Sequence, residues 1–170
     1  MSKPTFIFLI GFMGSGKTTI GKKMAKQLGY KFIDTDKLIE EKEGKSIPEI
    51  FSLYGEKYFR LLEKYRLNEI LELKGNYIVA TGGGMPCNQH RLNKMLKNGK
   101  VVYLEIDAKS AIKRLSKAKK KRPLLKYLTP IQLETKVFRM LTKRKKYYSQ
   151  AHITVSSLEA KKIDFKKLLD

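Results

Sequence analysis

The segment from Gly11 to Thr19, with the sequence GFMGSGKTT, contains the residue types that bind a nucleoside triphosphate. It fits the Gly-x4-Gly-Lys-Thr pattern of a phosphate-binding loop, or P-loop. Glycines are needed there because backbone N–H groups must wrap closely around phosphate oxygens, in conformations that side chains would block. Lys17 should reach the β- and γ-phosphates of ATP, and the Thr18 hydroxyl should ligate Mg²⁺. The residues of this loop expected to contact the nucleotide are Gly14, Ser15, Gly16, Lys17, Thr18 and Thr19.

Two carboxylates follow the next β-rich run. Asp34 and Asp36 are two residues apart, so in extended backbone they project to the same side. Phosphoryl transfer needs a group that orients the attacking hydroxyl, and it needs help in holding Mg²⁺ through water. Asp36 suits the first role and Asp34 the second. The alternative is that the Asp34-Thr35-Asp36 triplet only caps the helix that follows.

Arginine and glycine residues further along can bind an acidic acceptor. Arg60 lies near the start of a long expected helix with Glu63 one turn later, so a surface ion pair between them is the simplest alternative. Gly82, Gly83 and Gly84 directly follow a third β-rich run. Three glycines let a backbone approach a ligand closely, although a flexible turn would have the same sequence.

The segment from about residue 114 to 126 is a candidate lid. Lys117–Arg122 reads KAKKKR and precedes an Arg-Pro turn, a pattern that fits either a solvated loop or a mobile lid. An arginine such as Arg122 on a closing lid can neutralise charge on the transferred phosphoryl group and exclude water. Arg144, on a later expected helix, is a second candidate cation. Each arginine taken alone is more often only a surface residue.

Short β-rich runs alternate with segments of helical period along the chain. This alternation predicts an α/β fold with a parallel sheet covered by helices on both faces. In open sheets of this type ligands bind beyond the carboxyl ends of the strands, where these motifs fall. The expected strands are Thr5–Ile10, Lys31–Asp34, Tyr77–Thr81, Val101–Ile106 and His152–Val155. The expected helices are near Lys17–Leu28, Glu56–Leu73, Asn88–Leu96, Ala108–Ser116, Pro130–Tyr148 and Leu158–Leu169.

Length and charge limit the class of protein. The 170 residues suffice for one well-buried core, so residues 1–170 are expected to form a single domain. The net charge of +21 is spread over nearly every expected helix rather than one stripe, so we expect no nucleic-acid partner. The single cysteine, Cys87, excludes an internal disulfide, and no apolar segment is long enough to span a membrane. These features predict a cytoplasmic protein without a membrane partner, and the short chain fits a small-molecule kinase better than a GTPase, motor or helicase.

Taken together, the motifs resemble those of shikimate kinases in order through nearly the whole chain. Any single motif is shared with other P-loop kinases, whereas the ordered set is specific. The motifs are GFMGSGKTT at 11–19, DTD at 34–36, GEKYFRLLE at 55–63, ATGGG at 80–84, RPLL at 122–125 and RKKYY at 144–148.

The resemblance implies a doubly wound, five-stranded parallel P-loop kinase fold, with a substrate-binding segment at about 34–63 and a lid over the site. The implied reaction transfers the γ-phosphate of ATP to the 3-hydroxyl of shikimate, with Mg²⁺ as cofactor, and we expect a monomer. Asp36 would hold the ring hydroxyl, and Arg60 and Arg144 would hold the carboxylate. A glycine of the 82–84 triplet, such as Gly83, would contact substrate through its backbone, and Arg122 would reach the ATP phosphates. Phe51 and Phe59 occupy positions that wall the substrate ring in this family.

Some positions depart from the family pattern or leave alternatives open. The family's adenine-stacking arginine corresponds to either Arg114 or Lys117. His152 stands where an acidic residue is common, and a strand-edge histidine without a role is the preferred interpretation. Another small-metabolite kinase, such as a gluconate or nucleotide kinase, is the nearest alternative, with Arg60 and Arg144 as the discriminating residues. A catalytically silent ATP- or RNA-binding regulator is the alternative from another class; the retained Lys17 and its partner residues argue against it.

Overall fold

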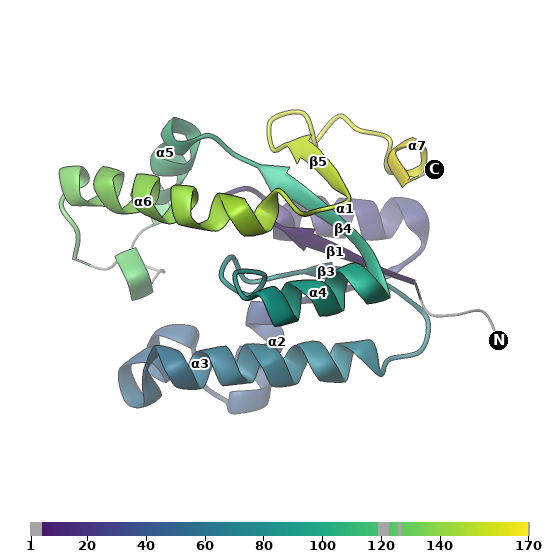
Figure 1. The fold of residues 1–170 in the computed structure, drawn as a ribbon, viewed down its shortest axis with the longest axis horizontal. Coiled ribbons are helices and arrows are strands. Elements are labelled where there is room, and N and C mark those ends of the chain that lie inside the picture. The colour runs from purple at the N-terminus through teal and green to yellow at the C-terminus, as the bar shows by residue number, and fades with distance from the viewer. Residues whose placement is uncertain (1–4, 119–122, 126, 170) are drawn as a thin grey trace.

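The computed structural model describes residues 5–118, 123–125 and 127–169, and within these ranges five parallel strands form one sheet (Figure 1). The order across the sheet is β2-β3-β1-β4-β5, which places the first strand in the centre. The predicted doubly wound α/β fold is therefore confirmed, because crossovers run in both directions from β1. The strands are β1 (Thr5–Ile10), β2 (Lys31–Asp34), β3 (Asn76–Ala80), β4 (Gly99–Glu105) and β5 (Ile153–Ser156).

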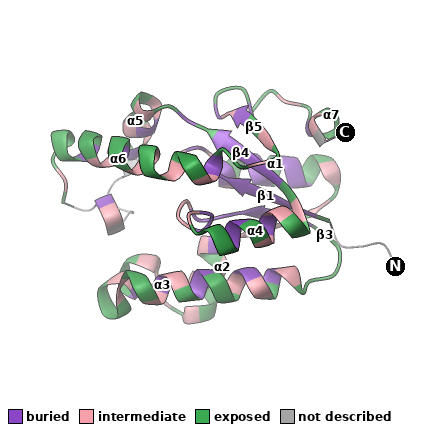
Figure 2. Cartoon of the chain, viewed as in Figure 1, coloured by how far each residue is buried: buried purple, intermediate pink, exposed green. Residues whose placement is uncertain are grey.

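Helices cover both faces of the sheet, with α1 and α7 on one face and α3, α4, α5 and α6 on the other. Figure 2 shows the central strands β1, β3 and β4 largely buried and the helices banded, as expected for amphipathic segments. No helix in the described ranges has both the length and the apolar character needed to cross a membrane. The helices are α1 (Lys17–Leu28), α2 (Thr35–Glu43), α3 (Ile47–Leu71), α4 (Gln89–Asn98), α5 (Ala108–Ala118), α6 (Pro130–Tyr148) and α7 (Phe165–Leu169), with a 3-10 turn at η2 (Pro123–Leu125).

The central strand supplies alternate residues to two separate cores. Phe6 and Phe8 face α3, α4 and α6, whereas Ile7 and Leu9 face α1 and α7. All four side chains are at most 2% exposed, which explains why β1 reads as an unbroken apolar run. The packed core fixes the end of β1, from which the phosphate-binding loop departs.

Two helical segments differ from the sequence-based expectation in the first half of the chain. The short helix α2 was not among the expected helices, although the capping alternative for the Asp34-Thr35-Asp36 triplet implied one, and α3 begins at Ile47 rather than near Glu56. Ser46 starts α3 with a reciprocal capping box to Glu49. Gly55 then interrupts the helix with φ 77° and ψ 174°. The apolar spacing before Gly55 is therefore out of phase with the spacing after it, and only the second part was predicted as a helix.

The last helix is shorter than expected. We predicted a helix over Leu158–Leu169, but turns precede α7 and the helix covers only its final five residues. The Ser156 hydroxyl accepts a hydrogen bond from the backbone N–H of Leu158 at 3.3 Å. Such local hydroxyl contacts favour a turn over a helix. That prediction was therefore wrong for the first half of the segment.

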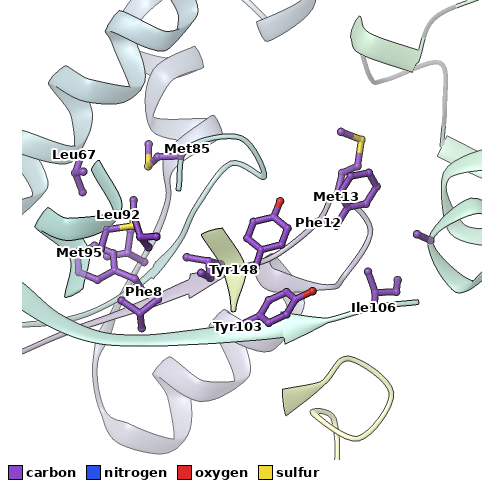
Figure 3. Close-up of a cluster of buried hydrophobic side chains, with 14 of the residues drawn as sticks. Phe8, Phe12, Met13, Leu67, Met85, Leu92, Met95, Tyr103, Ile106 and Tyr148 are labelled. Carbon is purple, nitrogen blue, oxygen red and sulfur yellow. The ribbon is translucent and has the colours of Figure 1, made fainter. Parts of the chain in front are cut away.

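The core beneath α6 contains two stacked tyrosines (Figure 3). The rings of Tyr103 on β4 and Tyr148 on α6 lie 5.1 Å apart, and the Tyr148 side chain is fully buried. Burial of this last residue of α6 holds the C-terminal end of the helix against the sheet. Arg144, one turn earlier on α6, is thereby fixed relative to the sheet.

We expect Thr129→Ala to lower the free energy of unfolding by about 1 kcal/mol, because Thr129 forms the capping box that starts α6. Thr135→Ala on the same helix is the matched control. Its hydroxyl bonds only to a carbonyl one turn back, and alanine has the higher helix propensity. Urea unfolding of both variants checks the prediction, and equal losses would contradict it.

Candidate active site

The P-loop joins β1 to α1 at the carboxyl edge of the sheet. Gly14 and Gly16 have φ values of 82° and 91°, which other residues rarely adopt. The Lys17 ammonium group is buried and donates to the carbonyls of Gly11 and Phe12 at 2.8 and 2.9 Å. A cavity of about 230 Å³ opens at the loop, and five of the six predicted nucleotide-contacting residues line it. The sixth, Ser15, is buried behind the loop and is 1% exposed; the other five are Gly14, Gly16, Lys17, Thr18 and Thr19.

The side chain of Asp34 connects the P-loop to α2. Its Oδ2 accepts a hydrogen bond from Thr18 Oγ1 at 2.7 Å, and its Oδ1 accepts from the backbone N–H groups of Asp36 and Lys37. Asp34 therefore caps α2, as the alternative interpretation expected, and its other carboxylate oxygen faces the P-loop. A hydroxyl and a carboxylate beside a phosphate cradle fit Mg²⁺, which uses few protein oxygens when phosphates and water complete its shell.

A second cavity of about 390 Å³ adjoins the first. Every residue predicted to bind the acceptor lines this cavity. Residues far apart in the sequence therefore converge as expected. The two cavities share Asp36 and Gly83, and also Thr18 and Asp34. The predicted acceptor-binding residues in its lining are Asp36, Arg60, Gly82, Gly83, Gly84 and Arg144.

Each glycine of the 82–84 loop lies directly against one of the predicted acceptor-binding side chains. A Cβ atom at the first or third glycine would overlap the facing side chain, and one at Gly83 would lie 3.3 Å from a guanidinium nitrogen. The triplet therefore packs closely against these side chains, which would have to shift to admit a Cβ atom at Gly82 or Gly84. The facing pairs are Gly82 with Asp36, Gly83 with Arg144 and Gly84 with Arg60.

Arg60 is held by two glutamates. Its Nη1 donates to both carboxylate oxygens of Glu63 at 2.8 and 2.9 Å, and its Nη2 contacts Glu56 at 2.7 Å. The predicted ion pair with Glu63 exists, but it is not on the surface, because the Glu63 side chain is fully buried. Burial raises the pKa of Glu63, and the positive charge of Arg60 opposes that rise.

Arg144 reaches the cavity from α6. Its guanidinium carbon lies 5.5 Å from the centre of the Phe12 ring, and its Nη1 is buried without a hydrogen-bond partner in the described part of the chain. A buried, unsatisfied donor of this kind is complementary to an anionic ligand. The rings of Phe51 and Phe59, 4.9 Å apart, form an apolar wall of the same cavity.

The predicted lid is described only in part, and Arg122 lies outside the described residues. Leu124, in the described turn Pro123–Leu125, lines the 390 Å³ cavity. Arg114 Nη1 donates to the Gly14 carbonyl of the P-loop at 2.7 Å. The structure therefore places Arg114 against the P-loop at Gly14, although it does not line the 230 Å³ cavity.

Sequence reasoning did not identify the residues that anchor the glycine loop. The Gly82 N–H donates to Thr35 Oγ1 at 2.9 Å, and Tyr148 Oη donates to the Gly83 carbonyl at 2.6 Å. Thr35 lies between Asp34 and Asp36, and the sequence suggested roles only for these two acidic residues. His152 also differs from expectation, because its Nδ1 accepts from the backbone N–H of Val101 at 3.0 Å and so joins β4 to the start of β5.

A larger cavity, of about 890 Å³, lies between α5 and α6. Its lining includes Ile112 and Phe138 but none of the motif residues. Size alone therefore does not identify the site, and we place the chemistry in the two smaller, polar cavities at the strand ends.

Comparison with known proteins agrees with this location. The shikimate kinase family matches residues 13–170. A shikimate kinase from Sulfurihydrogenibium sp. is 45% identical over 89% of this chain and 87% of its own length. A shikimate kinase from Persephonella marina is 42% identical over 89% of this chain and 88% of its own length. The motif resemblance is therefore confirmed over nearly the whole chain.

Solved structures give the same result. A shikimate kinase from Bacteroides thetaiotaomicron has a TM-score of 0.88 at 35% identity, covering 97% of this chain and 98% of its own. One from Acinetobacter baumannii, in complex with shikimate, has a TM-score of 0.86 at 36% identity, covering 97% of this chain and 93% of its own. A gluconokinase from Sinorhizobium meliloti is only 15% identical, with a TM-score of 0.51, covering 92% of this chain and 83% of its own. At this identity the likeness shows the fold alone. By sequence and structure together, this chain belongs to the shikimate kinase family of ATP-dependent kinases.

Proposed function

We propose that the two adjoining cavities transfer the γ-phosphate of ATP to the 3-hydroxyl of shikimate, giving ADP and shikimate 3-phosphate. The observation that carries the proposal is their shared lining. Asp36 and Gly83 belong to both cavities, so a phosphate held by the P-loop and a hydroxyl held by Asp36 meet without an intervening wall. Positioning of this kind, together with charge stabilisation, is what phosphoryl transfer requires of a protein.

On the donor side, the P-loop amides bind the β- and γ-phosphates. Lys17 exchanges its contacts with loop carbonyls for the phosphate oxygens, since its ammonium already lies over the loop. Thr18 and Asp34 are the residues that would hold Mg²⁺, and the ion would neutralise the charge of the triphosphate. Arg122 adds a second cation from the lid. Of the two candidates for stacking on adenine, Arg114 is supported by its contact with Gly14.

On the acceptor side, the ring hydroxyl donates to Asp36, which orients it and receives its proton. Arg60 and Arg144 bind the carboxylate, because guanidinium groups offer paired donors that match a carboxylate. The Gly83 backbone N–H contacts the substrate between them. The Phe51 and Phe59 wall packs against the ring. We further propose that the enzyme works as a cytoplasmic monomer.

A panel of acceptors tests the substrate assignment. In a coupled ADP-release assay, we expect turnover with shikimate and little or none with gluconate or nucleoside monophosphates. The physical reason is that only shikimate presents both a carboxylate for the two arginines and a ring for the aromatic wall. Absence of turnover with shikimate, beside turnover of another acceptor, would refute the assignment and leave the P-loop assignment intact.

Lys17→Met should lower kcat by about a hundredfold or more, because it removes a cation from the developing phosphoryl charge. Lys22→Met, an exposed position on the same helix, is the control and should keep full activity. Thermal unfolding followed by circular dichroism should show both variants folded. Full activity in the Lys17 variant would contradict the donor role.

Arg144→Ala should raise the KM for shikimate about ten- to a hundredfold, the cost of losing a charged hydrogen bond, and should change the KM for ATP little. Arg139→Ala is the matched control, since Arg139 lies on the same helix but lines the cavity between α5 and α6. Equal effects on the two Michaelis constants would mean that the carboxylate role is misplaced.

A further inference from the structure

Glu63 is a buried carboxylate beneath the acceptor cavity, and two arginines from different helices contact it. Arg60, on the same helix, donates to both of its oxygens. Arg91, on α4, places Nη2 3.5 Å from Glu63 Oε2. The Glu63 side chain has no exposure and that of Arg91 only 10%. The structure therefore contains an Arg60–Glu63–Arg91 triad that spans α3 and α4, which lie side by side in Figure 1.

Arg91 also contacts the loop that carries the glycines. Its Nε donates to the Met85 carbonyl at 2.7 Å, one residue after Gly84. Arg60 has two neighbours that Arg91 also contacts. One is the glycine loop, since Gly84 lies against the Arg60 guanidinium, and the other is Glu63. One buried guanidinium thus connects both supports of Arg60.

The charge surrounding this triad favours an anionic ligand. A cavity of about 370 Å³ next to the acceptor cavity is bordered by Arg60, Arg91 and Arg144, with Glu56 as the acidic residue in its lining. The lining therefore has three arginines to one glutamate, and the buried Glu63 pairs with two of these arginines, Arg60 and Arg91. Burying a further arginine is costly unless it is paired, and Arg91 is paired with Glu63 although it lines no part of the acceptor cavity itself.

We propose that Arg91 is a positioning residue for the substrate carboxylate. It keeps Glu63 ionised and fixed, and Glu63 in turn holds the Arg60 guanidinium in the orientation that receives the carboxylate. The inference rests on the proposed function, because it assumes that Arg60 binds the carboxylate. Arg91 itself does not touch the substrate.

The ionisation of Glu63 supplies a readout that simple packing would not affect. Burial raises the pKa of Glu63, and the charges of Arg60 on α3 and Arg91 on α4 oppose the rise. The negative charge of Asp36 on α2 raises the pKa of Glu63. The pKa of Cys87, in the loop after β3, responds to the charges of Arg60 and Glu63. Removing the Arg91 charge should raise the pKa of Glu63 further. Protonation of Glu63 at low pH then releases Arg60, so the acid limb of kcat/KM for shikimate should move to higher pH.

The test compares Arg91→Gln with Lys94→Gln. Both residues lie on α4, and Lys94 also contacts α3, through Asn68 Oδ1 at 2.7 Å, but it does not contact Glu63. The Arg91 variant should raise the KM for shikimate roughly tenfold, within the range of coupled ion pairs, and leave the KM for ATP unchanged. Its acid limb should shift to higher pH. The Lys94 variant should match the wild type in all three measurements.

Arg91→Lys keeps the proposal testable if the glutamine variant fails to fold. Lysine retains the charge beside Glu63 but cannot hold Met85 and Glu63 together in a planar fork. We expect the acid limb to stay near that of the wild type, with a smaller rise in the KM for shikimate. A shift of the acid limb as large as that expected for the glutamine variant would overturn the proposal, as would equal KM changes for both substrates or a Lys94 variant that behaves like the Arg91 variant. Failure of the wild type to phosphorylate shikimate would instead refute the proposed function, so the two failures are distinct.

Discussion

The parallel pairing of β1 with β3 is the constraint on which the site depends. It ends in Thr81, whose backbone N–H and hydroxyl both contact the Leu9 carbonyl at 3.1 Å. Immediately beyond that point the P-loop and the glycine loop leave the sheet side by side. The Cβ position of Gly83 is 3.4 Å from the Gly11 carbonyl and from the Met13 backbone nitrogen. The donor and acceptor halves of the site are therefore placed against each other by close backbone packing, in which a Cβ atom at Gly83 would already be in van der Waals contact with the P-loop.

A loop of three glycines has no side chains with which to hold itself, so its neighbours must supply the contacts. Polar groups from three helices do so: Thr35 of α2 binds Gly82, Tyr148 of α6 binds Gly83, and Arg91 of α4 binds Met85. Burial raises the pKa of the Tyr148 hydroxyl, which therefore remains a protonated donor at any physiological pH. Buried polar contacts are conformationally specific because each has one satisfactory geometry. The loop is consequently defined by its supports, although its own residues are the most flexible type.

Much of this arrangement could be predicted from the sequence, and the exceptions have physical causes. β1, β2, α1 and α6 were predicted with the observed bounds because apolar runs and capping residues delimit them. The helix over Leu158–Leu169 was overestimated because Ser156 forms a local turn. The nine-residue α2 was implied only by the capping alternative for the Asp34-Thr35-Asp36 triplet, because its short sequence has little helical periodicity. Side-chain types made Asp36, Arg60 and Arg144 candidates, and the family resemblance supplied their acceptor roles; all three line the acceptor cavity. Arg91 and Thr35 escaped notice because their roles arise from contacts between segments far apart in the chain, and no local pattern reports such contacts.

The fold does not by itself select the acceptor, since a gluconokinase shares it at only 15% identity. The sequence-based expectation that Arg60 and Arg144 discriminate between acceptors does not extend to gluconate, because gluconate also carries a carboxylate. The remaining difference between the two acceptors is shape: shikimate is a ring, and gluconate is an open chain. A ring presents a broad apolar face, which the tilted pair of Phe51 and Phe59 can cover. Selectivity between these anions should therefore come from the aromatic wall on α3. The arginines and their buried glutamate would fix the end of the molecule that does not react, and so bring the 3-hydroxyl to Asp36.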